Sequence, residues 1–162
     1  MINGKSKFTN FKIHTQYSIC EGAIKINDLA EYCKQNKVPA IGLSDSYNLC
    51  GALEFSEEIS KAGTQPIIGT QINFEYLDTI GKLPIFAKTQ TGYNNLVKLS
   101  SKSFLDSQNS PIPQCPIKLL FDNNEDLIVL SGGIESIFSN LLKKNKLKEF
   151  QNLGEKLKKI FK

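Results

Sequence analysis

The sequence predicts an α/β fold built around a mainly parallel sheet. Short apolar runs that read as strands alternate with stretches of helical periodicity, which is typical of right-handed βαβ crossovers. The 162 residues, 40% of them apolar, suffice for one moderate core, so a single domain or part of one is expected. The pattern does not separate a barrel from an open sheet.

The individual elements follow from apolar spacing and from chain-breaking residues. The candidate strands are 11–14, 40–44, 66–74, 83–88 and 127–130. The candidate helices are 26–36, 52–62, 92–104 and two closing stretches after residue 133. Residues 105–116, with three prolines, are expected to form a surface loop.

The end of the chain carries an apolar stripe on a predicted helix: Leu147, Phe150, Leu153, Leu157 and Phe161. Such a stripe after five candidate strands normally packs on a sheet that continues, so a truncated domain is expected. The domain is assigned to residues 1–162, with residues 143–162 as its helical, lysine-rich end.

The net charge of +4 is concentrated in one place. From Lys143 onward, eight lysines face only Glu149 and Glu155, which leaves the preceding residues at about −2. All 20 basic residues are lysine, so the chain has no guanidinium for bidentate phosphate contacts. The fragment is therefore not expected to be the principal DNA reader, and its lysine-rich end is either a solvated helix face or a contact for DNA or protein.

The cysteines and the apolar runs indicate a cytoplasmic protein. Four widely spaced cysteines form neither a zinc-site spacing nor a secreted disulfide framework. No run is long enough for a membrane span, and the N-terminus has no signal-peptide core. We therefore expect reduced thiols and no membrane association.

Five phrases, in order, carry a family resemblance. They are Ile13-His14-Thr15-Gln16-Tyr17-Ser18 with Glu21-Gly22-Ala23, then 43–55, 61–69, Gly92-Tyr93-Asn94-Asn95-Leu96 and Leu130-Ser131-Gly132-Gly133. Together they resemble the start of the bacterial DNA polymerase III alpha subunit family. That resemblance implies a PHP domain, a distorted (β/α)7 barrel whose active relatives bind metal ions and hydrolyse phosphoesters; about five of its strands would be present here.

The resemblance also implies where metal ligands would lie. The His-x-His pair of active members falls at Lys12 and His14, and the acid before the next glycine is kept as Glu21. The Asp-His pair after the second strand falls at Asp45 and Ser46.

At three further positions where the resemblance implies a metal ligand, this chain has a different type of residue. They fall at Gln71, Lys82 and Gly133. A protonated lysine repels a cation instead of binding it, so Lys12 and Lys82 argue against a metal. The site is predicted to be vestigial and to hold no metal, with no catalytic residue.

Several positions keep two interpretations. His14 is either a hydrogen-bonded structural histidine or a ligand, and 45–50 is either an ordinary strand-to-helix turn or part of a catalytic site. Gly132 and Gly133 form either a tight turn or a phosphate cradle. We also expect Lys12 to pair with Glu21 or Asp45 in place of a cation.

Three functions follow from this. The leading hypothesis is a structural and docking module of the replicase, whose partners are the remainder of the alpha subunit, a proofreading exonuclease and, through the parent protein, a sliding clamp and DNA. The parent would be a magnesium-dependent DNA-directed DNA polymerase, a nucleotidyltransferase, whereas the fragment lacks the polymerase site and any cofactor. The alternatives are a PHP phosphoesterase or pyrophosphatase with residual activity, and a stand-alone interaction protein.

Overall fold

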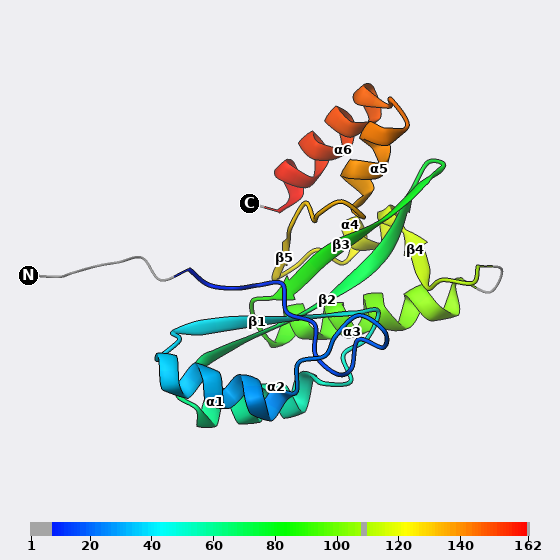
Figure 1. Ribbon diagram of the computed structural model, residues 1–162. Coiled ribbons are helices and arrows are strands. Elements are labelled where there is room, and N and C mark those ends of the chain that lie inside the picture. Colours follow the sequence, from blue (N-terminus) through cyan, green and yellow to red (C-terminus); the bar gives the residue numbers. More distant parts are fainter. Residues whose placement is uncertain (1–7, 108–109, 162) are drawn as a thin grey trace, which may run out of the picture.

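A mixed sheet forms the centre of the computed structural model, which describes residues 8–107 and 110–161 (Figure 1). Within those ranges the sheet has five strands: β1 (Ala40–Ser46), β2 (Gln65–Tyr76), β3 (Thr79–Ala87), β4 (Gln114–Pro116) and β5 (Leu127–Val129). The strand order is β1-β2-β3-β5, and β4 pairs with the distal part of β2.

Helices flank this sheet. They are α1 (Ile26–Asn36), α2 (Ala52–Lys61), α3 (Gln90–Leu105), α4 (Ile117–Asp122), α5 (Ile137–Lys143) and α6 (Leu147–Ile160). Helices α1 and α2 lie together below β1, while α5 and α6 form a pair at the opposite end of the molecule (Figure 1). The α/β class is confirmed, and α1 has the bounds that the apolar spacing predicted.

The first half of the sheet is a βαβ unit. Strands β1 and β2 run parallel, from the pair Ala40 and Gln65 to the pair Ser46 and Gln71, with α2 as the crossover. Side chains at the carboxyl end of β1 therefore lie beside those in the middle of β2, which continues to Tyr76. This register is what brings the candidate site together.

The expectation of a mainly parallel sheet is wrong in the second half. Strands β2 and β3 form an antiparallel hairpin, and β3 pairs with β5 antiparallel as well. Only Leu77 and Asp78 separate β2 from β3, and a parallel return needs a crossover of a dozen or more residues. Leu77 supplies the left-handed backbone of that turn, with φ of 57°.

Two other predicted elements differ. The expected strand 11–14 is reduced to a bridge between Ile13 and Leu43, although it still runs parallel to β1. The expected loop 105–116 contains the short strand β4 at its end. The run 11–14 was predicted as a strand but forms the Ile13 bridge rather than a full strand, whereas β4 has three residues, too few to show a strand period.

The core has two parts, which lie along the same face of the sheet. One lies among α1, α2 and β1 and contains Ile26, Leu43, Phe55 and Ile59. The other lies between the β2–β3 hairpin and helices α3 to α6. The two parts are continuous, because Leu49 and Ile68 pack against both.

The predicted stripe on the last helix finds a partner within the chain. Leu153 and Leu157 are buried, and the Phe150 ring meets the Phe138 ring of α5 edge to face at 5.4 Å. Leu147, at the start of α6, remains 61% exposed. None of the helices in the described part of the chain has the length and apolar character needed to span a bilayer.

Candidate functional site

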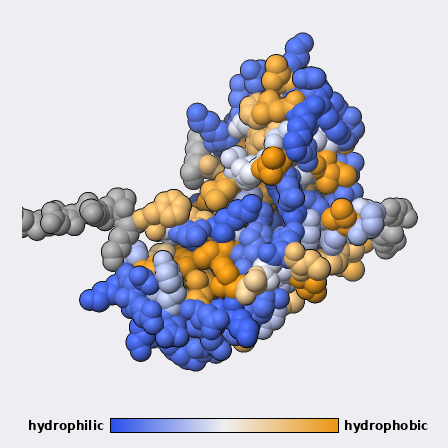
Figure 2. Space-filling view, in the orientation of Figure 1, coloured by the Kyte–Doolittle hydropathy of each residue, from blue (hydrophilic) through white to orange (hydrophobic). Residues whose placement is uncertain are grey.

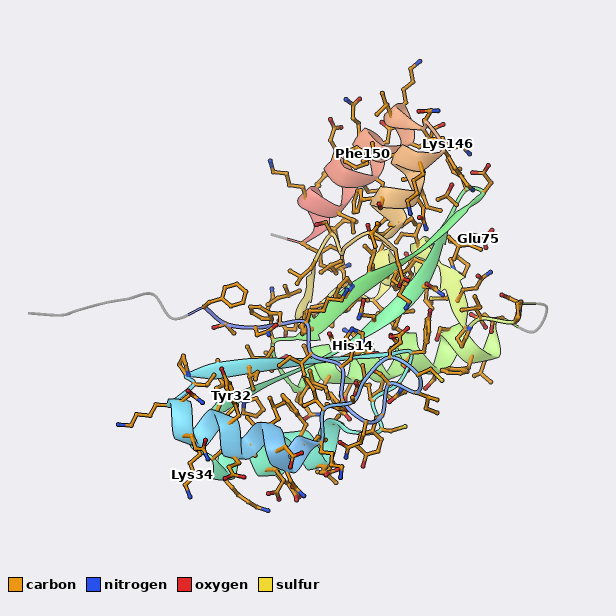
Figure 3. All side chains as sticks on the ribbon, viewed as in Figure 1. His14, Tyr32, Lys34, Glu75, Lys146 and Phe150 are labelled. Carbon is orange, nitrogen blue, oxygen red and sulfur yellow. The ribbon has the colours of Figure 1, made fainter. Side chains whose placement is uncertain are left out.

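Polar side chains converge at the carboxyl end of β1 and the middle of β2, where the segment 10–18 runs beside β1. Ser46 and Gln71 are register partners on these neighbouring strands, and His14 approaches them from the segment beside β1 (Figure 3). The loop 15–24 brings Glu21 to the same place, and β3 contributes Lys82. The structure thus gathers five of the eight positions that the sequence singled out.

Asp45 is buried and fully engaged by neutral donors. Its carboxylate accepts hydrogen bonds of 2.6 Å from the Thr15 backbone N–H, the Thr15 hydroxyl and the Ser18 hydroxyl. The Ser18 hydroxyl in turn accepts from the Ser46 backbone N–H at 3.1 Å. Asp45 therefore holds the loop 15–18 against the end of β1 by hydrogen bonds. These contacts give Asp45 a structural role.

His14 is held by both ring nitrogens. Gln71 Nε2 lies 3.2 Å from the Ser44 carbonyl oxygen, which can only accept, so this Gln71 atom is the donating nitrogen. The same atom lies 2.7 Å from His14 Nε2, which must therefore accept. The proton of the neutral ring then sits on Nδ1, which lies 3.3 Å from both Glu21 Oε2 and Ser18 Oγ.

The charges around His14 favour this neutral form. Burial of the ring is the largest influence on its pKa and lowers it below the ordinary value of 6.5. The ammonium groups of Lys12 and Lys82 lower the pKa further, while the carboxylates of Glu21 and Asp45 oppose them. A neutral imidazole with both nitrogens occupied is a structural group in this setting.

Lys82 supplies a cation inside the cluster. Its ammonium lies 2.8 Å from Glu21 Oε1 and 3.1 Å from Glu135 Oε2, and it sits over the Tyr47 ring at 5.3 Å from the centroid. Burial alone would lower the pKa of Lys82, but the hydrogen bonds to Glu21 and Glu135 outweigh it and raise the pKa. Lys82 is therefore charged at every physiological pH.

Glu21 is the carboxylate that this ammonium neutralises. Burial tends to raise the pKa of Glu21, but hydrogen bonds from Lys82 and from the Ser46 hydroxyl, together with the charge of Lys82, bring it below its ordinary value. Glu21 is consequently ionised, and its two oxygens face Lys82 on one side and Ser46 and His14 on the other.

The expectation that Lys12 pairs with Glu21 or Asp45 is wrong. Neither carboxylate forms an ion pair with Lys12 anywhere in the part of the chain that the structure describes. The Lys12 ammonium lies instead beside the loop after β5, 3.9 Å from the place that a Cβ on Gly133 would take. Lys82 forms the ion pair with Glu21 in place of Lys12, because β3 directs its side chain toward Glu21.

The loop after β5 behaves as a turn. Gly132 has φ of 78°, which a residue with a side chain rarely adopts, and the Ser136 N–H donates to the Gly133 carbonyl at 3.0 Å. Ser136 then caps α5 by accepting from the Ser139 N–H. The two glycines serve the chain reversal that leads into α5.

Two residues of the cluster were not predicted. Tyr47 follows β1 with a left-handed backbone, φ of 64°, and its hydroxyl accepts a hydrogen bond from the Asn73 amide at 3.1 Å. Glu135 provides the second carboxylate for Lys82. The sequence offered one signal for Tyr47, its position directly after the polar end of a buried strand. It offered no signal for Glu135, because the partner Lys82 lies far away in the sequence, on β3.

The donors present do not fit a metal centre of the PHP type. Within residues 8–107 and 110–161, no three His, Cys, Asp or Glu side chains are grouped so as to hold an ion. Asp45 is saturated by neutral donors, the His14 nitrogens are both engaged, and Glu21 faces an ammonium. A cation at this point would meet the charge of Lys82, so the absence of a metal is the prediction that the donor set favours.

A hollow of about 580 Å³ opens beside the cluster. Lys12, His14 and Glu21 form its polar end together with Asn10, and most of the remaining wall is apolar, with Ile24, Leu29 and Ile41 among the contributors. Figure 2 shows this hydrophobic surface over β1, between the N-terminal segment and α1.

Comparison with known proteins agrees with the motifs. The PHP domain family model matches residues 10–162. Relatives include the DNA polymerase III subunit alpha of Caulobacter vibrioides, 35% identical over 95% of this chain and 14% of that protein, and that of Borreliella burgdorferi, 33% identical over 97% and 15%. The chain therefore spans about one seventh of the length of these curated relatives.

Solved structures resemble the chain more distantly. A proposed metal-dependent phosphoesterase from Bifidobacterium adolescentis has a TM-score of 0.45 and 15% identity over 85% of this chain and 50% of its own. The family assignment rests on the sequence matches instead, since the family model covers nearly the whole chain. DNA polymerase III alpha subunits are among its relatives, and the chain belongs to the PHP domain family.

Proposed function

We propose that this chain is a non-catalytic PHP domain of a DNA polymerase III alpha subunit, and that it serves as a structural and docking module with a vestigial metal site. Polymerisation, with magnesium as its cofactor, would belong to the rest of the alpha subunit. The partners on this proposal are that remainder, a proofreading exonuclease and, through the whole protein, the sliding clamp and DNA. The setting would be the cytoplasm.

One observation supports the proposal above the others. The Lys82 ammonium contacts Glu21 at 2.8 Å in the middle of the group formed by His14, Ser46 and Gln71. A partly desolvated carboxylate favours a cationic partner, and the Lys82 ammonium provides one for Glu21 without a metal ion. A domain whose ligand positions satisfy each other internally keeps its shape without catalysing hydrolysis.

Metal content and hydrolysis test this function together. The purified chain, dialysed against zinc and manganese and then desalted, is expected to hold far less than one metal ion per molecule by elemental analysis. It should not hydrolyse a chromogenic phosphodiester above the background rate. Stoichiometric metal with turnover that His14→Ala abolishes would instead establish a PHP phosphoesterase.

The variant Lys82→Ala sharpens this test. Removing the ammonium frees Glu21, but His14 and Glu21 alone give too few ligands for a tight site. The variant should therefore remain metal-poor. If it acquires one zinc ion per chain while the parent does not, Lys82 is the sole barrier to metal binding and the site is not vestigial.

A further inference from the structure

The β2–β3 hairpin tip and the turn between α5 and α6 form one surface. The Lys144 ammonium donates to the Asp78 carbonyl oxygen at 2.7 Å, and Lys146 pairs with the Asp78 carboxylate. Asn140 donates to the Ile80 carbonyl oxygen at 2.8 Å. Figure 3 shows Lys146 on the helical pair, reaching the hairpin side of the molecule. These contacts hold the two segments side by side; we call the surface the hairpin–helix tip.

The hairpin–helix tip leaves large apolar side chains in water. Leu77 is 63% exposed and Leu147 61%, with Ile80 and Leu142 exposed beside them in the chain. Elsewhere the same two elements bury their apolar residues well, since Leu83, Ile137 and Leu141 are fully buried. Clustered exposed apolar residues rimmed by polar ones are typical of an interaction site.

The rim of the hairpin–helix tip is basic. Between residues 143 and 148 there are four lysines and no acidic residue. Lys146 is neutralised by Asp78, but Lys143 and Lys144 donate only to backbone oxygens, and no carboxylate within the described ranges pairs with Lys148. Three ammonium groups therefore remain available to a partner that carries negative charge.

We propose that the hairpin–helix tip binds an acidic protein segment that carries leucine-like side chains. The apolar residues would insert among Leu77, Ile80, Leu142 and Leu147, while carboxylates would meet Lys143, Lys144 and Lys148. Nucleic acid fits less well, because the surface offers neither arginine nor an exposed aromatic ring on which a base could stack. The proposal rests on the docking role given above and names the surface and the partner.

A direct binding experiment uses defined probes. Fluorescence anisotropy of the full chain is measured with a labelled 12-residue peptide of alternating glutamate and leucine pairs, with a glutamate–serine peptide of equal charge and with a 12-nucleotide single strand. We expect the glutamate–leucine peptide to bind at least tenfold more tightly than either other probe. Equal or tighter binding of the single strand would overturn the proposal in favour of a nucleic-acid surface.

Matched variants locate the binding site. Leu77→Ser with Leu147→Ser should weaken glutamate–leucine binding at least tenfold, and Lys144→Glu with Lys148→Glu should do the same. The controls Leu53→Ser with Leu105→Ser and Lys25→Glu with Lys34→Glu change exposed residues elsewhere and should leave binding within twofold. Equal losses in tip and control variants would refute the location, and circular dichroism shows that each variant is folded.

The two proposals fail separately. If the tip variants bind the peptide normally but metal and hydrolysis are absent, the docking surface is wrong and the vestigial site stands. If metal and turnover are found while the tip variants lose binding, the enzyme assignment changes and the surface stands.

Discussion

Two neighbouring carboxylates in this domain are stabilised in different ways. Asp45 is fully buried and is surrounded by a backbone N–H and two hydroxyls. Glu21 is 37% exposed at its side chain and faces the Lys82 ammonium. The family resemblance predicts metal-site positions at both, yet each has its oxygens occupied by the protein itself.

The difference follows from how deeply each carboxylate is buried. In the interior, neutral donors satisfy a carboxylate without the large desolvation cost of a second ion. Near the surface, water screens the charges, so an ion pair costs less and contributes less. Asp45 should therefore matter for folding, and Glu21 with Lys82 should matter mainly for local order around the site.

Asp45→Ala is expected to give the largest loss of stability. The substitution leaves the Thr15 N–H, the Thr15 hydroxyl and the Ser18 hydroxyl without their acceptor in a buried place. Each unsatisfied group costs about 1 to 3 kcal/mol, so we expect the free energy of unfolding in urea to fall by about 3 to 5 kcal/mol. The loop 15–18 should lose its protection in amide hydrogen exchange.

The exposed Asp106, at the end of α3, provides the matched control. Asp106→Ala should change the free energy of unfolding by less than about 0.5 kcal/mol, because an exposed acid makes few costly contacts. A loss of similar size in both variants would show that the Asp45 hydrogen bonds are not the source of the stability.

Lys82→Met should have a smaller effect. It removes the ammonium but keeps the apolar stem, and leaves Glu21 without its cation. Because Glu21 is partly solvated, the loss should be about 1 to 2 kcal/mol after screening. The double variant Glu21→Gln with Lys82→Met should recover much of this loss, which a double-mutant cycle in urea would measure.

The pH dependence of this coupling has a definite sign. The pKa of Glu21 is lowered by folding, so its contribution is present above the ordinary value of 4.5 and is lost as the pH falls through the folded pKa. The pKa of Lys82 is raised, so its contribution is present below 10.5 and is lost only at higher pH. Above pH 7, where His14 is neutral, a coupling energy that varied up to pH 10 would contradict the ion pair.

Much of the fold could be predicted because it is local. The face formed by Ile26, Leu29, Ala30 and Cys33 predicted α1, and all four residues are buried on that helix. The β2–β3 hairpin was missed because its turn, Leu77-Asp78, lacks the glycine or asparagine that usually marks one. The strand predicted at 11–14 is only a bridge at Ile13, because pairing along its length depends on a partner distant in sequence, which no local pattern reveals.

The sequence predicted which residues form the site better than it predicted the contacts between them. The five predicted positions that converge are His14, Glu21, Ser46, Gln71 and Lys82, because they lie on three neighbouring strands and on the segment beside β1 with the loop that follows it. Which lysine meets Glu21 depends on the direction of a long side chain across the sheet, and Lys82 was not chosen. The roles of Tyr47 and Glu135 depend on the same three-dimensional placement.

The titration of His14 is the smallest effect and the most direct test of the cluster. The chain has a single histidine, so its imidazole gives one unambiguous set of nitrogen signals by NMR. We expect the pKa to lie below 6.5 and the neutral ring to carry its proton on Nδ1. Because the folded pKa is lowered, this residue should reduce stability as the pH falls below the ordinary value.

Two charge variants give the sign of each influence on that titration. Glu21→Gln removes a carboxylate that raises the pKa of His14 and should lower it further, whereas Lys12→Met removes an ammonium that lowers the pKa and should raise it. Lys34→Met, on the outer face of α1, should leave the titration unchanged (Figure 3). If neither Glu21→Gln nor Lys12→Met shifted the titration, burial alone would govern the pKa of His14, and the ring would not sense the charges beside it.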